Sequence, residues 1–278
     1  MNALINAIFE ILSLPFMRYA LIAGPLIALV ASLLGVTLVL KRYSMIGDGL
    51  SHVSFGALAV ATVLQVAPLH LALPVTVVAA VVLLRLSEKG KLKGDALTAM
   101  ISTGSLAVGV LALSLSSGMN VDVYNYMFGS IFTLTRTDVI LAVLLALVVI
   151  PLYILLFPRL FSITFDRSFA RASGLNTSLY DTVMAILTAL TIVLGMRLMG
   201  TLLISALIVF PPLTAMRVAK SFSSVAVLSA ILPVVSFLCG LCLSFFCSTP
   251  PGASVVIINL LFFAIFSLIS LIRNKVKK

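Results

Sequence analysis

Nine long apolar runs dominate the sequence and leave almost no residues outside a membrane. Each run is roughly 17 to 24 residues long, the length that an α-helix needs to cross a hydrocarbon core of about 30 Å. Only 9% of the 278 residues are charged and 62% are hydrophobic, too few charges to cover a soluble fold. We therefore predict an all-α, polytopic membrane protein with about nine transmembrane helices, forming one domain over residues 1–278. The predicted spans are approximately 17–40, 50–66, 70–87, 97–116, 138–157, 178–196, 198–218, 223–246 and 252–273.

The basic residues predict the orientation of the chain. If the N-terminus is external, 15 of the 18 Lys and Arg residues fall on the cytoplasmic side, and only Arg18, Arg136 and Arg197 fall outside. This asymmetry follows the positive-inside rule and predicts a cytoplasmic C-terminus. The net charge of +10 is thus explained by topology and contacts with lipid headgroups, without any nucleic acid partner.

Two segments fit neither a span nor a solvated loop. Residues 118–137 are too polar to cross a membrane alone, and we expect a re-entrant or interfacial piece there. In it, Asp122, Tyr124, Asn125 and Tyr126 face the external side, either at the mouth of a pathway or as membrane anchors. Residues 2–14 could lie flat on the membrane. They contain no Lys or Arg, so we expect no cleaved signal peptide.

The most informative polar residues are Asp48 and His52, at the start of the second span. In a helix their i, i+4 spacing places both on one face, where a carboxylate and an imidazole form part of a site for zinc, manganese or ferrous iron. Two ligands suit a transit site that must release its ion. Ser51 could orient the imidazole, and Gly47 lets a neighbouring helix approach. Alternatively, Asp48 caps the helix and His52 is a hydrogen-bonded residue of the bundle.

The other metal-ligating residue types carry weaker hypotheses. His70 follows a proline at the external start of the third span, where an interfacial role is favoured over a ligand role. Cys239 and Cys242 form a C-x-x-C pair that could bind a soft metal, but thiols also fill space between packed helices. With Cys247 in the same apolar run, the cysteines do not predict a disulfide framework.

Two cytoplasmic stretches could contact a soluble partner. Pro211 and Pro212 are expected to interrupt the seventh span, so that residues 211–222 form a short amphipathic piece along the membrane surface. The residues that would transmit motion from a partner are Pro211, Pro212, Leu213, Thr214, Ala215, Arg217 and Lys220. The second stretch, residues 165–181, predicts a short helix ending near Gly174. Both stretches are also compatible with simple basic or solvated loops.

Four segments together resemble one family. They are GDGLSHVSFGALA, FDRSFARASGL, RLMGTLLISALIVFPPLTA and TPPGASVVIINLLFF, and the resemblance extends from about residue 17 to 273. The chain resembles the membrane subunits of bacterial ABC importers for zinc, manganese or iron, the ABC-3 metal permease family.

The resemblance implies a type II importer-like permease in the bacterial inner membrane, paired with a second permease that is identical or paralogous. It also implies two cytoplasmic ATP-binding subunits and an external metal-binding protein. Asp48 and His52 would then face the pathway, and Pro211 to Phe222 would be the coupling helix. The chain itself would be no enzyme and would hold no covalent cofactor, and the divalent metal ion would be its transported substrate.

Three other function classes are weighed against this one. A permease for iron-siderophore or cobalamin cargo would need a wide polar and aromatic cavity, and the chain has no tryptophan. An ion-coupled secondary carrier could use Asp48 as a proton relay. An intramembrane enzyme is disfavoured because the two histidines are separated by a span and no H-E-x-x-H helix is present. The sequence does not choose among zinc, manganese and iron.

Overall fold

The computed structural model describes residues 15–88, 94–115, 129 and 134–276, and in these ranges the elements are α-helices joined by short turns. Nine of the described helices are long and apolar enough to cross a membrane, which confirms the predicted fold class. They are α2 (Pro15–Leu40), α3 (Ser44–Val63), α4 (Pro68–Glu88), α5 (Gly94–Leu115), α7 (Arg136–Phe165), α9 (Thr177–Met199), α10 (Thr201–Val218), α11 (Phe222–Cys247) and α12 (Pro251–Val276). The predictions for residues 2–14 and for Asp122, Tyr124, Asn125 and Tyr126 lie outside the described residues.

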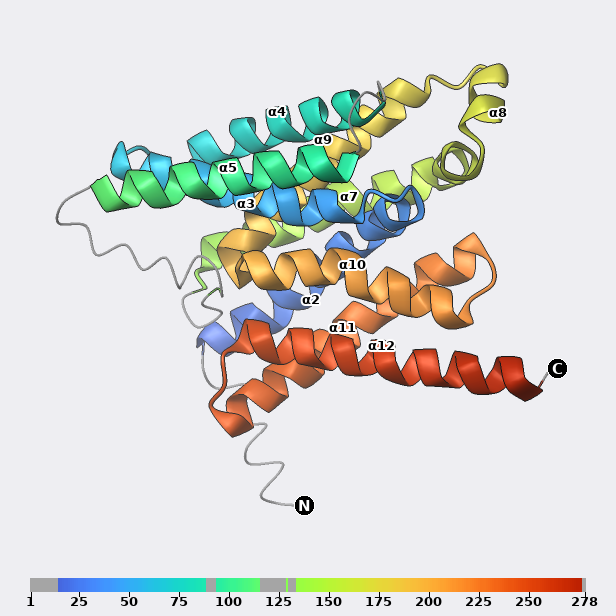
Figure 1. Ribbon diagram of the computed structural model, residues 1–278. Coiled ribbons are helices and arrows are strands. Elements are labelled where there is room, and N and C mark those ends of the chain that lie inside the picture. The colour runs from blue at the N-terminus through green and yellow to red at the C-terminus, as the bar shows by residue number, and fades with distance from the viewer. Residues whose placement is uncertain (1–14, 89–93, 116–128, 130–133, 277–278) are drawn as a thin grey trace.

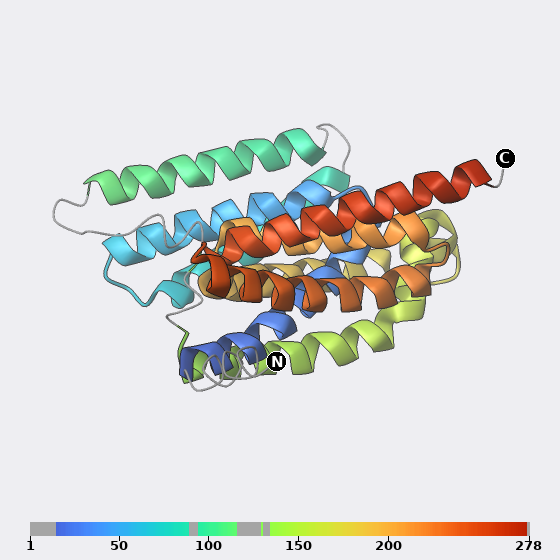
Figure 2. The same cartoon turned by 90° about the horizontal axis from the view of Figure 1, so that it is seen from below.

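The long helices lie side by side, with α2 in the middle (Figures 1 and 2). α2 packs against α7, α9, α10 and α11, and 78% of its apolar stretch is buried. α5 covers α3 and α12 covers α10 and α11, and for each of these two outer helices only 11% is buried. Their outer faces are therefore available to lipid or to another protein.

Helix bounds differ from the sequence prediction in two places that affect function. α3 begins at Ser44, six residues before the predicted start, so Asp48 and His52 lie within the helix. α7 is 30 residues long and continues through Pro151 and Pro158 to Phe165. Prolines are tolerated in membrane helices because neighbouring groups satisfy the freed carbonyls.

The expected break at Pro211 and Pro212 is wrong. α10 runs without interruption from Thr201 to Val218, and both prolines are buried within it. Proline takes the helical φ angle, and its cost is a missing N–H donor and crowding of the preceding turn, which packing against α2 and α12 outweighs here. No separate surface helix stands between α10 and α11 in this described region, because Ser221 already caps α11 through the Ser224 N–H.

The second cytoplasmic stretch does contain a short helix, α8 (Arg167–Ala172). The Asp166 side chain accepts a hydrogen bond from the Phe169 N–H at 2.9 Å and caps its start. Beyond α8 the chain turns at Gly174, whose φ of 82° favours glycine. As a result α8 stands at one end of the bundle (Figure 1).

Candidate functional site

Asp48 and His52 lie together on α3, as their spacing predicts. Asp48 Oδ1 is 3.8 Å from His52 Nε2, and the two side chains are 49% and 20% exposed. α3 packs against α4, α5, α9 and α10, and most of its residues from Ile46 to Ala61 are buried. Asp48 is therefore about half uncovered by the rest of the protein, whereas His52 is largely buried beside it.

The alternative role of Asp48 as a helix cap does not fit the structure. The residue at the N-cap position is Tyr43, and no side chain caps this helix end. Asp48 is the fifth residue of α3, beyond the first turn, where caps act. Its carboxylate thus remains available to a ligand.

Ser51 and Gly47 connect α3 to α10. The fully buried Ser51 hydroxyl donates to the Asp48 carbonyl at 2.7 Å and lies 3.2 Å from the Ser205 hydroxyl of α10. A Cβ on Gly47 would lie 3.1 Å from the Ile208 side chain, tighter than ordinary contact. Both residues position the helix that carries the pair, and Ser51 uses its hydroxyl for this rather than for the imidazole.

The pair offers only part of a metal coordination shell. Nε2 of His52 faces Asp48, while Nδ1 is buried and has no hydrogen-bond partner among the described residues. Within the same residues, no cluster of three or more His, Cys, Asp or Glu side chains could hold a metal ion. A four-coordinate site would need ligands beyond those that the described residues bring to this pair.

The other candidate ligands lie elsewhere. His70 is exposed at the start of α4, by the opposite end of α3 from His52, and lines a cavity of about 470 Å³ with Arg197. Cys239, Cys242 and Cys247 are free thiols exposed on α11. The structure therefore brings neither His70 nor the C-x-x-C pair to Asp48 and His52.

Comparison with known proteins identifies the family. Residues 13–270, nearly the whole chain, match the ABC 3 transport family. The chain belongs to this family. The resemblance to the metal permeases of ABC transporters is confirmed, as is the expected location of a multi-pass protein in the bacterial cytoplasmic membrane.

Relatives of this ABC 3 permease include transporters of different metals. It is 32% identical to the high-affinity zinc uptake system membrane protein ZnuB of Haemophilus influenzae, over 88% of this chain and 94% of that protein. It is 24% identical to the manganese transport system membrane protein MntC of Listeria monocytogenes, over 90% of each. The solved structure of PsaBC from Streptococcus pneumoniae in complex with Fab has a TM-score of 0.82 and 25% identity, over 93% of this chain and 95% of that one.

The predicted coupling residues of the permease divide into two groups. Those within α10 are mainly buried and pack the helix: Pro211, Pro212, Thr214 and Ala215, with Leu213 half-buried. Arg217 and Lys220 are exposed, and the Arg217 guanidinium lies 5.0 Å from the ring centre of Phe263 in α12. Residues 211–222 thus do not form an independent docking element.

A buried ionic network in the permease was missed by sequence reasoning. Asp181, one turn into α9, forms ion pairs with Lys41 and with Arg167. The stretch 165–181 reads as a solvated connection, but an acidic residue at the edge of an apolar span is a signal that should have been weighed. Its partner Lys41, 140 residues away, could not be inferred from local spacing.

Proposed function

We propose that this ABC 3 permease moves a divalent transition-metal cation into the cytoplasm in an ATP-driven importer, and that Asp48 and His52 bind the ion in transit. The observation that carries the proposal is the 3.8 Å carboxylate–imidazole pair on α3, in which the Asp48 side chain is 49% exposed. The names of the relatives favour zinc or manganese, and a carboxylate with an imidazole suits both as well as ferrous iron.

We further propose that the pathway lies between this chain and a second permease, identical or paralogous. One protomer supplies two ligands, and a two-fold related copy would supply two more, which completes a four-coordinate site. The half-exposed carboxylate of Asp48 would then be covered by the partner rather than by lipid. An external metal-binding protein would deliver the ion to the pathway from the outer side of the membrane.

ATP hydrolysis would take place in separate cytoplasmic subunits that dock on α8. This helix stands at the cytoplasmic end of the bundle and exposes Arg171 and the Phe169 side chain, the latter 64% exposed. An exposed aromatic ring beside a basic residue is typical of a protein contact. Arg217 and Lys220, exposed at the same end, would flank this contact. Rocking of the two permeases would open the pathway to one side at a time.

Metal uptake by variants of the pair tests the site. In cells that lack the native permease, Asp48→Ala and His52→Ala should each reduce uptake of radioactive zinc or manganese more than tenfold, because half of the local ligands are removed. His70→Ala changes the same residue type as His52 at an exposed position by the other end of α3 and should keep uptake near wild type. Wild-type uptake of every metal by both pair variants, at equal protein level, would contradict the assignment.

Energy dependence separates this proposal from an ion-coupled carrier. Cells depleted of ATP with their membrane potential held constant should stop importing the metal. Purification of the tagged permease should also recover an ATP-binding subunit. Continued uptake without ATP would instead assign Asp48 to proton coupling.

A further inference from the structure

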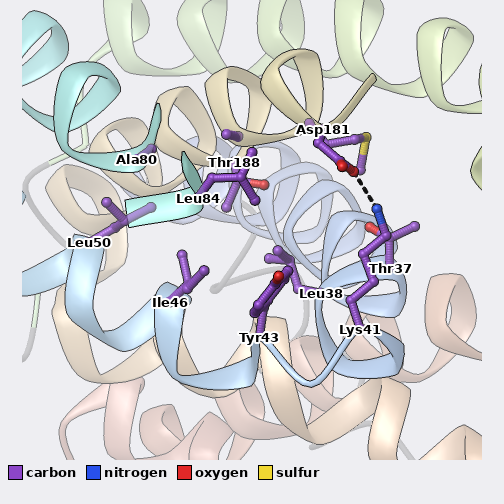
Figure 3. A pocket seen from close by; sticks show the side chains of 12 residues that line it. Thr37, Leu38, Lys41, Tyr43, Ile46, Leu50, Ala80, Leu84, Asp181 and Thr188 are labelled. Carbon is purple, nitrogen blue, oxygen red and sulfur yellow. Dashed lines mark hydrogen bonds and ion pairs between the residues drawn. The ribbon is translucent and has the colours of Figure 1, made fainter. Parts of the chain in front are cut away.

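Asp181 connects two parts of the protein through one buried carboxylate. Its side chain is only 4% exposed, and each oxygen takes a different cation. Oδ1 accepts a hydrogen bond from the Lys41 ammonium (Figure 3), and Oδ2 lies 2.9 Å from the Arg167 guanidinium. A buried carboxylate held by two cations is a strong and specific link.

The two cations belong to elements with different roles. Arg167 is the first residue of α8, and Lys41 lies in the turn between α2 and α3. α8 packs mainly against α7 and α9. Asp181 and its two ion pairs connect this helix to the α2–α3 turn.

Two cavities border this link. One cavity of about 30 Å³ is lined by Lys41, Tyr43, Asp181 and the α3 residues Ile46 and Leu50 (Figure 3). A second, of about 270 Å³, again includes Lys41, Tyr43 and Asp181. Since close packing is what makes protein interiors stiff, the link depends on its charges more than on contact between apolar side chains.

Neighbouring cations hold the start of α9 in other ways. Arg85 of α4 donates to Ser178 and, at 3.0 Å, to Thr182. Arg171 donates to Thr177 at 3.1 Å. The start of α9 is thus anchored independently of Asp181, and a change of the carboxylate should leave α9 in place.

We propose that Asp181 is a positioning residue that transmits movement of α8 to the metal-binding helix α3. When the ATPase shifts α8, Arg167 pulls on Asp181, and Lys41 passes the displacement to the α2–α3 turn. Asp48 is seven residues beyond Lys41, so this turn controls the orientation of the pair. The inference rests on the proposed function, in which α8 contacts the ATPase and α3 binds the ion.

Uncoupling of transport from ATP hydrolysis is the expected effect of Asp181→Asn. The substitution keeps the size of the side chain and removes the charge that holds both cations. In the complete transporter, reconstituted with its ATP-binding subunits and external binding protein, basal ATP hydrolysis should stay within twofold of wild type. Metal uptake per ATP hydrolysed should fall more than tenfold, a ratio that a merely structural defect would not change.

Two further variants keep the test decisive. Asp95→Asn removes a carboxylate from an exposed position at the start of α5 and should leave the ratio unchanged. The double variant Lys41→Met with Asp181→Leu removes the more buried of the two ion pairs as a whole, and the remaining cation, Arg167, is 32% exposed and can reach water. This variant should therefore fold even where a buried uncompensated charge prevents folding, and it should be uncoupled as well. A wild-type ratio in either Asp181 variant would overturn the inference.

The result also separates this inference from the proposed function. If Asp48→Ala imports metal normally, the site assignment is wrong whatever Asp181 does. If Asp48→Ala abolishes uptake while Asp181→Asn retains the wild-type ratio, only the transmission role of Asp181 is lost.

Discussion

Asp138 illustrates the effect of one ionised side chain at a helix start. Its side chain is 7% exposed and completes a capping box with Thr135, whose N–H donates to the carboxylate at 3.0 Å. Arg197 Nη2 lies 3.3 Å from the same carboxylate. The residue thus joins the start of α7 to the end of α9.

Asp138→Ala should lower the stability of the protein by about 1–2 kcal/mol, because its half of the capping box and its ion pair with Arg197 are lost. Thermal unfolding in detergent measures this as a lower midpoint. Asp95→Ala is the control, and an exposed substitution of this kind should stay within about 0.5 kcal/mol. Equal midpoints for the two variants would contradict the role of Asp138.

Removal of the Tyr153 hydroxyl should not destabilise the protein, in contrast to the loss of the Asp138 carboxylate. The residue is 2% exposed in α7, and its hydroxyl has no hydrogen-bond partner among the described residues. Tyr153→Phe should therefore leave the unfolding midpoint unchanged or raise it, since a buried unpaired hydroxyl costs about 1–3 kcal/mol. Tyr153→Ala, which empties the space, should lower stability by about 3–5 kcal/mol. A clear loss in the Phe variant would indicate a hidden partner.

Prediction from sequence worked for residues whose partner is nearby in the chain. Asp48 and His52 are four residues apart, so helical geometry alone places them on one face. Asp181 depends on Lys41 and Arg167, which only the packing of α2 and α8 against α9 brings to it. Local periodicity contains no information about such contacts.

At the scale of helices, the crossing of α2 and α10 depends on one glycine. A Cβ on Gly35 would lie 2.0 Å from the Ile208 carbonyl oxygen, a backbone atom that cannot move alone. Gly35→Ala should therefore destabilise the protein by about 1–3 kcal/mol through overpacking. Thermal unfolding and the yield of folded protein measure the effect.

Gly104 is the matched control for this crossing. It also lies within a membrane helix, but nothing stands within 4 Å of a Cβ built on it. Gly104→Ala should be neutral or stabilising by up to about 1 kcal/mol, because alanine is the better helix former. Similar losses in both variants would show that helix contact at Gly35 is not the cause.

Helix ends were harder to predict than helix centres. The predicted start of α3 is residue 50, yet Ser44 to Gly49 are already helical and most of them are partly or fully buried by neighbours. The break expected at Pro211 and Pro212 follows local preference, whereas packing around α10 overrides it. In each case the helix boundary depends on burial by neighbouring helices, which local composition does not contain.

For the whole molecule, the question is whether two permeases share one metal ion or each binds its own. A pair with one wild-type and one variant permease distinguishes the two cases. Two permeases joined through an added transmembrane linker, which brings the chain back to the outer side before the second copy begins, should show full uptake when both are wild type. If the copies share one ion, Asp48→Ala in a single half should reduce uptake as strongly as the same change in both halves. Retention of about half the uptake would mean that each copy binds an ion by itself. His70→Ala in one half is the control.

The place of the pair along α3 has an electrical consequence. Asp48 is the fifth residue from the cytoplasmic end of the helix, about 6 Å along its axis. A cation arriving there from outside has crossed most of the transmembrane voltage, which is worth about 2.3 kcal/mol per charge for each 100 mV, and a divalent ion experiences twice that. An inside-negative potential then draws the ion toward Asp48 and His52, and depolarised cells should load these ligands less well at the same external metal concentration.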